Sequence, residues 1–262
     1  MPRLILKIIN FIISTVLVII LLLTGTYAVY SLWDNARIYN AAEDVQADML
    51  RIKPEADKVE KDGGASFEAL KAVNNDVRAW LTLDDTKVDY PVLQGENNLS
   101  YLNTDVYGNF ALAGSIYMDS RNKADFSDRY VLLYGHHMDG GRMFGDLDKF
   151  KTEKFFKKNT EETTGQLILP DRSYQLQVFA VLVLPASDST IFSPMKWKDD
   201  ISGPLEKAAN ESMFCNDALI NSLEKDPDAQ IIALTTCTSE FTDARTIVLA
   251  VMKSQQTAGV EE

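Results

Sequence analysis

The sequence predicts a mostly β domain with added helices, in which about eight strands form an antiparallel β-barrel or a β-sandwich. Three observations predict this fold class. Short β-rich runs follow one another through about 190 residues, few helical patterns lie between them, and Asp-, Gly- and Asn-rich turns separate them. Closing the sheet into a barrel would leave no exposed edge strand. The runs are KVDYPVL, GSIYMD, YVLLYGH, GQLILP, SYQLQVFAVLVL, IIALTTC and RTIVLAVM.

The chain begins with an apolar segment that is long enough to cross a bilayer. Residues 8–33 carry no charged side chain, and roughly 20 apolar residues span a membrane as a helix. A cleaved signal peptide has a shorter apolar region, and residues 26–28 match a cleavage site only weakly, so an uncleaved anchor is favoured. Arg3 and Lys7 precede the segment, which by the positive-inside rule keeps the N-terminus cytoplasmic. Residues 1–33 are therefore expected to form a cytoplasmic N-terminus and a single transmembrane helix, with the rest of the chain extracellular.

The segment after the anchor is expected to be a stalk. Residues 34–65 are mixed in charge and rich in alanine, which is typical of a helical or flexible linker. The folded domain is expected over residues 66–254, followed by a flexible tail at 255–262. Its first element is predicted as a helix over residues 66–81, because Ser66 can cap it and apolar residues follow at helical spacing.

One connection between strand runs is much longer than the others. Residues 186–230 separate the sixth run from the seventh and include the helix-like stretch ESMFCNDALINSL. Connections longer than about 12 to 15 residues usually serve function or carry their own structure. We expect at least one helix there, and a wall for substrate beside the strand that ends at Cys237. Ile191 and Phe192 are candidate substrate contacts, with loop packing as the alternative, and Cys215 is expected to be a buried, unpaired thiol in a helix.

Composition excludes some classes of partner and site. The net charge is −12 and no Lys- or Arg-rich tract occurs, so the phosphate backbone of a nucleic acid would be repelled. Two adjacent histidines with distant cysteines do not supply the four ligands of structural zinc. The acidic stretch DGGRMFGDLDKF lacks the spacing of an EF-hand loop and is interpreted as a solvated loop. No metal or cofactor is expected.

Three reactive side chains lie at the ends of predicted strands. The only histidines, His136 and His137, end the run YVLLYGHHM, Cys237 ends IIALTTC, and Arg245 opens RTIVLAVM after a seven-residue gap. Strand ends on a rigid sheet hold reactive groups in exposed positions. A hairpin between the last two runs would bring the cysteine and the arginine together. The pattern predicts a nucleophilic-cysteine site, with a buried structural cysteine as the alternative.

The chemistry of these groups assigns their roles. The thiolate of Cys237 is the nucleophile, and a nearby cation favours it. Arginine cannot act as a base, so Arg245 is expected to orient a peptide carbonyl and stabilise an oxyanion. An imidazole must then transfer the proton, and because neighbours on a strand point to opposite faces, only one histidine of the pair can do so. Thr235 and Thr236 supply hydroxyls immediately before the thiol and are candidate substrate contacts.

The chain resembles a class B sortase, one of the membrane-anchored cysteine transpeptidases of Gram-positive bacteria, over roughly residues 66–253. The matching stretches are NNDVRAWLTL, VDYPVLQGENNLSYL, GSIYMDSRN, YVLLYGHHMDGGRMFGDL and LTTC with its downstream arginine. The resemblance implies a sortase-like barrel with an N-terminal helix and a helix-bearing insertion before the cysteine strand. It implies His136 as the catalytic imidazole, Cys237 as the nucleophile, Arg245 as the cation that binds substrate and oxyanion, and Thr236 as a substrate contact. Ala233 replaces the first Thr of the family's TLxTC motif, for which we expect a packing change only.

The resemblance also implies the reaction. Cys237 would attack the carbonyl of a threonine in a C-terminal sorting signal of a surface protein or pilin, forming a thioacyl enzyme. An amine of the peptidoglycan cross-bridge or of a pilin lysine would resolve it, for cell-wall anchoring or pilus polymerisation. A single-pass protein of the cell membrane fits this role. The alternatives are a cysteine hydrolase that uses the same pair, and a non-catalytic surface domain in which Cys237 belongs to the core.

Overall fold

The computed structural model describes residues 2–56, 65–160, 162–238 and 240–254. The chain divides into two compact units, residues 1–41 and 42–262. The predicted tail at 255–262 and the stalk residues 57–64 lie outside the described residues, as does the side chain of Ser66.

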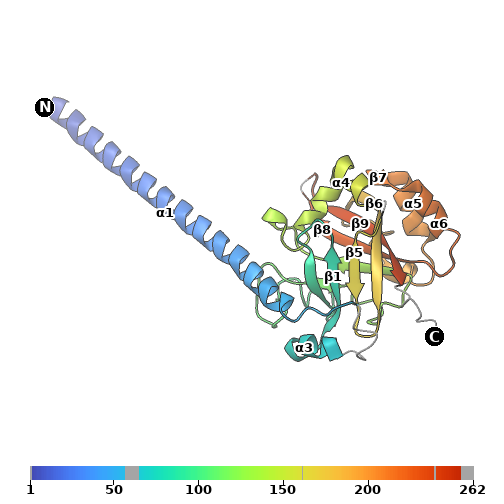
Figure 1. Cartoon of the computed structure of the whole chain (residues 1–262). Coiled ribbons are helices and arrows are strands. Elements are labelled where there is room, and N and C mark those ends of the chain that lie inside the picture. Colours follow the sequence, from blue (N-terminus) through green and yellow to red (C-terminus); the bar gives the residue numbers. More distant parts are fainter. Residues whose placement is uncertain (1, 57–64, 161, 239, 255–262) are drawn as a thin grey trace. The chain divides into compact units, whose positions relative to one another are not determined.

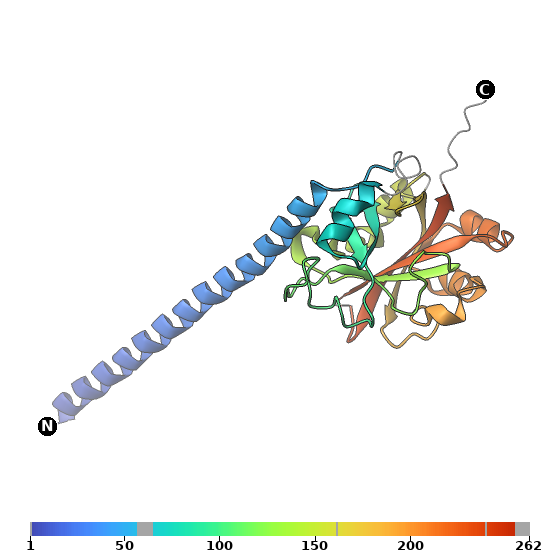
Figure 2. The same cartoon turned by 90° about the horizontal axis from the view of Figure 1, so that it is seen from below.

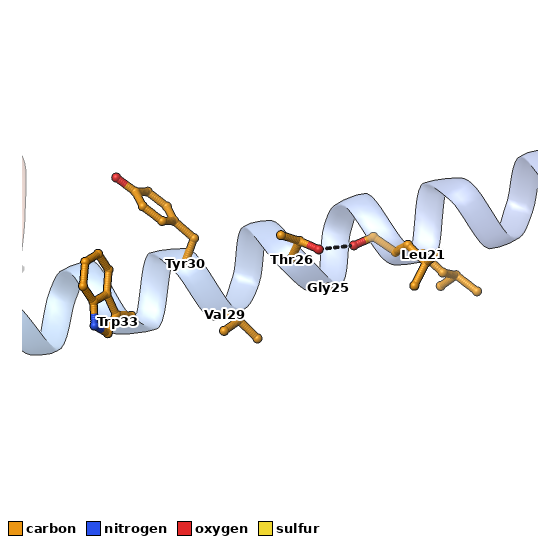
Figure 3. Close-up of a pocket in the computed structure, with 7 residues that line it drawn as sticks. Leu21, Gly25, Thr26, Val29, Tyr30 and Trp33 are labelled. Carbon is orange, nitrogen blue, oxygen red and sulfur yellow. Dashed lines mark hydrogen bonds between the residues drawn. The ribbon is translucent and has the colours of Figure 1, made fainter.

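The first unit consists of most of a long helix, α1 (Pro2–Leu50), drawn in blue in Figure 1. It is the one helix among the described residues that is long and apolar enough to cross a membrane, with a mean hydropathy of 2.7 in its most apolar window. A shallow hollow on this helix is shown in Figure 3, where Thr26 Oγ1 donates a hydrogen bond of 2.8 Å to the carbonyl of Leu22. The hollow is lined by α1 alone, which makes it a feature of a helix surface and no binding site. Its lining residues are Leu21, Leu22, Gly25, Thr26, Val29, Tyr30 and Trp33.

The last turns of α1 belong to the second unit. Met49 is buried in a core cluster with Phe67, Leu70 and Trp80, and Tyr90 donates a hydrogen bond of 3.1 Å to Gln46. The first part of the expected stalk is therefore helical, and its end packs on the folded domain.

The second unit is a closed eight-stranded barrel with one extra strand. The sheet order is β5-β1-β2-β3-β4-β8-β9-β6-β7, and pairing of β5 with β6 closes the barrel. Figures 1 and 2 show the strands wrapping around a common core. The strands are β1 (Val77–Leu83), β2 (Asp89–Leu93), β3 (Ile116–Met118), β4 (Tyr130–Tyr134), β5 (Gly165–Ile168), β6 (Ser173–Pro185), β7 (Phe214–Cys215), β8 (Gln230–Cys237) and β9 (Ala244–Ser254).

Two strand pairings are parallel, which corrects the expectation of an antiparallel barrel. β2 pairs with β3, and β4 pairs with β8, in parallel. Parallel neighbours require long crossover connections, and both pairs have them, through residues 94–115 and 135–229. The parallel pair β4–β8 matters for function, because both strands end on the same side of the barrel.

The helix predicted over residues 66–81 is wrong in its second half. Helix α3 (Ala65–Val73) ends where the amide of Asn74 bonds to the carbonyl of Leu70. The side chain of Asn74 then accepts a hydrogen bond of 2.9 Å from the amide of Asp76, an Asx turn that redirects the chain into β1. Trp80, read as part of the helix, lies fully buried on that strand.

The expected insertion is present between β6 and β8. It contains η3 (Pro194–Lys196), α5 (Ser202–Glu211), the short strand β7 and α6 (Asp217–Leu223). The helices α5 and α6 lie beside each other and pack against β6 (Figures 1 and 2). Cys215 lies on β7 and not in the predicted helix; its thiol is half-buried, unpaired, and 3.1 Å from Asp217 Oδ1.

The connection from β4 to β5 is largely helical. It holds η1 (Asp139–Gly141), η2 (Gly145–Lys151) and α4 (Glu153–Lys158). This connection begins directly after the two histidines, so its first elements lie next to the end of β4.

Candidate active site

The thiol of Cys237 lies at the exposed end of β8, opposite Arg245. The antiparallel register of β8 and β9 pairs Cys237 with Arg245, and directly opposed residues in such a pair have Cβ atoms about 4.5–5.5 Å apart. Cys237 is exposed and unpaired, whereas Arg245 is half-buried and donates a hydrogen bond of 3.0 Å to the carbonyl of Ala244. The predicted hairpin is confirmed, and it places a guanidinium beside the thiol.

His136 reaches the same end of the barrel on the other side of β8. The parallel register pairs Tyr134 with Thr235, and the amide of Gly135 bonds to the carbonyl of Thr235 at 3.1 Å. Continuing this register two steps past Tyr134 brings His136 level with Cys237, and paired strands are spaced about 4.8 Å apart. Cys237 is thus flanked by the chain segments that carry the imidazole and the guanidinium.

The ring of His136 is held by a backbone carbonyl. Its Nε2 lies 2.7 Å from the oxygen of Leu102, in the connection between β2 and β3. A carbonyl oxygen only accepts, so Nε2 must carry the hydrogen, and in the neutral ring the lone pair is on Nδ1. This contact orients the imidazole and leaves Nδ1 as the atom that can take up a proton.

The glycine before His136 is required by packing. A Cβ at Gly135 would lie 2.5 Å from Ile116 Cδ1 and 2.7 Å from Phe144 Cδ2. Real Cβ atoms do not approach so closely, so a larger residue would force either the side chains of Ile116 and Phe144 or the backbone before the imidazole to shift. Packing therefore explains why glycine occupies the central position of the YGH motif.

Two tyrosines line the barrel end next to the cysteine. The rings of Tyr117 and Tyr134 lie 5.3 Å apart, tilted by 31°. Burial raises the pKa of Tyr117 to about 12, and the charges of Asp119 and Cys237 act in the same direction while Arg245 opposes them. The phenol of Tyr117 therefore lies within electrostatic reach of both the thiol and the guanidinium.

A buried carboxylate links this end of the barrel to the insertion. Asp119 accepts hydrogen bonds from Tyr134 at 2.9 Å and from Arg121 at 2.8 and 2.7 Å. Arg121 also donates to the carbonyl of Phe192 at 3.0 Å. Burial would raise the pKa of Asp119, but the hydrogen bonds from Arg121 and Tyr134 outweigh it, and the pKa is lowered. The insertion is thus fastened to the strand that precedes His136.

The structure separates the proposed substrate contacts into two groups. Ile191 is 0% exposed, and its carbonyl accepts a hydrogen bond from Tyr130. Thr235 is 1% exposed, and its hydroxyl donates a hydrogen bond to the carbonyl of Leu133. Neither side chain reaches the surface, so the expectation that they contact substrate is corrected. Phe192 is half-buried, and the buried hydroxyl of Thr236 has no hydrogen-bond partner among the described residues. Of the four residues, only Phe192 keeps part of its side chain at the surface, because Thr236 is 2% exposed.

His137 is directed towards the connection that follows β4. Its Nε2 lies 2.9 Å from Asp148 Oδ2 in η2, and the residue forms an isolated bridge with Met143. In the part of the chain that the structure describes, no group of three or more His, Cys, Asp and Glu side chains is arranged to hold a metal ion.

Sequence reasoning did not find Tyr117, Asp119, Arg121 or the carbonyl of Leu102. Their positions near the thiol depend on the pairing of β3 with β4 and on the path of the β2–β3 connection. The stretches GSIYMDSRN and NNLSYL did mark these regions, but no pattern within them indicated contact with the histidine or the cysteine.

Comparison with known proteins agrees with this geometry. A family model for the sortase domain matches residues 81–253. Sortase B of Staphylococcus aureus is 31% identical over 190 residues, which cover 71% of this chain and 73% of that protein. A solved class B sortase of Streptococcus pyogenes, described as involved in pilus biogenesis, is similar with a TM-score of 0.63 at 35% identity, over 72% of this chain and 99% of that one. A complex of Staphylococcus aureus sortase B with substrate gives a TM-score of 0.64 at 26% identity, over 85% and 97% of the two chains.

The family match runs from residue 81, within β1, to residue 253, within β9, and includes His136, Cys237 and Arg245. The chain therefore belongs to the sortase family, and, as a relative of the class B enzymes, it is a cysteine transpeptidase of the sortase type.

Proposed function

We propose that this enzyme cleaves a C-terminal sorting signal after threonine and transfers the protein to an amine. The observation that carries the proposal is the arrangement around Cys237: an exposed thiol, paired in register with Arg245, at the barrel end where β4 delivers His136. An exposed strand end leaves room for an extended peptide. A core cysteine would not need a cation opposite it.

In the acylation step, the thiolate of Cys237 attacks the threonine carbonyl and forms a thioacyl bond as the C–N bond breaks. Arg245 donates hydrogen bonds to the oxygen on which negative charge develops. His136, protonated on Nδ1, gives that proton to the leaving amine, while the carbonyl of Leu102 keeps the ring oriented. In the second step the acceptor amine attacks the thioester, His136 takes its proton, and the thiolate returns.

Substrate contacts are proposed for Thr236 and Phe192. Thr236 directly precedes Cys237, and its hydroxyl is buried without a partner among the described residues. A substrate group that bonds to this hydroxyl would satisfy it. Phe192 lies near the start of the insertion, and its carbonyl accepts a hydrogen bond from Arg121. A sorting signal is expected to run between this part of the insertion and the end of β8.

Two acceptors fit a thioester chemistry of this kind: an amine of the peptidoglycan cross-bridge and a lysine of a pilin subunit. The Streptococcus pyogenes relative, whose description names pilus biogenesis, supports the second as an acceptor to test. The apolar helix α1 supports a single-pass anchor. With the basic residues before it inside, the catalytic domain would face the outer side, where exported substrates emerge.

The test uses the full-length chain in detergent with fluorogenic sorting-signal peptides, with and without an amine acceptor. One acceptor peptide carries a free N-terminal glycine and the other a lysine side chain. We expect cleavage that yields an amide product with acceptor, is lost in Cys237→Ala, and is kept in the matched variant Cys215→Ala. Release to water alone, even with saturating acceptor, would show a hydrolase. No cleavage, together with a Cys237 thiol that resists alkylation, would show a binding domain.

The orientation can be tested separately in intact cells. A membrane-impermeant thiol reagent should label Cys237 in the Cys215→Ala background without lysis. Labelling that appears only after lysis would contradict an extracellular domain.

A further inference from the structure

One ion pair contacts the chain neighbours of all three proposed catalytic residues. Asp148 and Lys151 lie three residues apart on η2, with Lys151 Nζ 2.7 Å from Asp148 Oδ1. Asp148 Oδ2 is 2.9 Å from Nε2 of His137, and Asp148 Oδ1 accepts a hydrogen bond of 3.3 Å from Thr246. These two partners follow directly after His136 and Arg245 in the chain.

The third contact is made by the lysine. Lys151 Nζ donates to Thr238 Oγ1 at 3.0 Å and to Glu240 Oε1 at 2.5 Å. Thr238 follows directly after Cys237, and its hydroxyl also bonds to Glu240. The ammonium therefore ties η2 to the loop through which the chain leaves the nucleophile.

The alternation of side chains explains why these contacts do not block the site. Successive side chains on an extended chain point to opposite faces. A residue that presents its side chain to the substrate therefore has a neighbour that points to the rear. The ion pair holds the backbone of the site from behind and leaves the thiol, imidazole and guanidinium free.

The electrostatics of the network are favourable. The Lys151 side chain is 15% exposed. Burial would lower its pKa, but the bonds to Asp148 and Glu240 outweigh this and the pKa is raised. The pKa of Glu240 is lowered to about 2, because the bonds from Lys151 and Thr238 outweigh its partial burial. The raised pKa of Lys151 and the lowered pKa of Glu240 keep both groups charged at neutral pH, so the bond between them is charge-assisted.

We propose that Asp148 and Lys151 are positioning residues for the transpeptidation, which keep the loop after Cys237 and the segments of His136 and Arg245 in mutual register. The inference rests on the proposed function of those three residues. Neither Asp148 nor Lys151 is expected to touch substrate, so their loss should reduce the rate of the chemical steps and leave peptide binding nearly intact.

The kinetic test compares Asp148→Asn and Lys151→Met with a matched control in the full-length chain. A misplacement of about 1 Å remote from the chemistry can cost about 100-fold, so we expect kcat to fall about 10- to 100-fold with KM changed less than about twofold. Lys151→Arg keeps the charge and the donors and should recover most of the rate. The control is Lys149→Met, on the same η2. Its ammonium pairs with Asp146 at 2.9 Å and, in the described part of the chain, bonds to no neighbour of the catalytic residues.

A second readout distinguishes failure of this inference from failure of the proposed function. In the Cys215→Ala background, the rate of alkylation of Cys237 is followed against pH without any substrate. The profile should change in Asp148→Asn and Lys151→Met, and stay unchanged in Lys149→Met. If Cys237 of the wild-type protein is alkylated but the protein does not turn over peptides, the proposed function fails. The alkylation profiles of the variants still test the positioning role of Asp148 and Lys151.

Three outcomes would overturn the inference. The first is wild-type kcat in Asp148→Asn and Lys151→Met. The second is a loss that Lys149→Met reproduces. The third is a fall in activity that follows a large fall in Tm and that Lys151→Arg does not recover, which would make the network a stability element only.

Discussion

Removal of the Arg121 guanidinium tests how a buried charge is tolerated beside the active site. The Asp119 side chain is 0% exposed and that of Arg121 is 44% exposed. Arg121 bonds to both carboxylate oxygens, while Tyr134 and Asn98 each donate to Oδ2 at 2.9 Å. The variant Arg121→Met keeps an unbranched apolar side chain and leaves the carboxylate with neutral side-chain donors only.

The size of the effect follows from these contacts. Breaking a buried ion pair by removing one partner costs about 3–5 kcal/mol. Solvent reaches much of Arg121 and the neutral donors remain, so we expect a loss of about 2–3 kcal/mol in the free energy of unfolding at pH 7. At roughly 2–4 °C per kcal/mol for a domain of this size, Tm should fall by about 4–12 °C.

The loss should depend on pH in a defined direction. The pKa of Asp119 is lowered from its ordinary value of 3.8, because the bonds of Arg121 outweigh burial. A carboxylate with a lowered folded-state pKa stabilises the fold above its unfolded pKa, and that contribution is lost as pH falls through the folded pKa. Without Arg121 the burial of Asp119 dominates and its pKa rises. The difference in Tm between wild type and variant should therefore be largest near pH 7 and shrink as the pH is lowered towards about 3.

Thermal unfolding of the full-length chain in detergent between pH 3 and pH 8 measures this difference. Arg51→Met is the matched control, because Arg51 pairs with Asp48 at 3.3 Å with side chains 78% and 51% exposed. Such surface pairs contribute about 0–1 kcal/mol. A deficit in Arg121→Met that is independent of pH, or no greater than that of the control, would refute the argument from buried charge.

Three further predictions concern the site and the insertion. Arg245→Lys keeps the charge but loses the planar fork of donors, so kcat in peptide cleavage should fall about 10²- to 10³-fold; a kcat within twofold of wild type would remove Arg245 from the oxyanion role. His136→Gln should abolish cysteine-dependent turnover, whereas His137→Gln, which keeps a donor towards η2, should lower kcat less than about 100-fold; equal losses would show that the two roles are not separate. Gly203→Ala would place a Cβ 2.1 Å from Trp197 Cη2, and overpacking of this kind costs about 1–3 kcal/mol; an unchanged Tm would show that the indole can move away freely.

Much of the barrel could be predicted because its strands are bounded by turn residues. The run IIALTTC corresponds to β8 and RTIVLAVM to β9. The misread element was β1, whose run VRAWLTL is buried at five of seven positions. A strand buried on both faces loses the alternation that distinguishes it from a helix. The parallel pairings could not be predicted either, because they depend on how distant segments close the barrel.

The candidate site shows the same division. His136, Cys237 and Arg245 could be named because rare or reactive residue types occur at the ends of apolar runs. Tyr117 and Arg121 belong to common types inside an ordinary stretch, and their role depends on which strands become neighbours. The local sequence pattern thus identifies the residues that react. The residues that orient them can be identified only from the tertiary structure.

The network around Asp148 and Lys151 depends on both the sequence pattern and the tertiary structure. Each proposed catalytic residue is followed by a residue with a hydrogen-bonding side chain: His137, Thr238 and Thr246. Taken alone, each of these residues is an ordinary polar residue near the end of a strand. Alternation along the chain turns all three to the rear of the site, and only the parallel pairing of β4 with β8 brings them within reach of one ion pair on η2. Because η2 lies in the connection that starts at the histidines, a displacement of this short helix would move the imidazole and the thiol together. In this proposal the precision of the site depends on a short helix that bonds to the neighbours of the reacting residues.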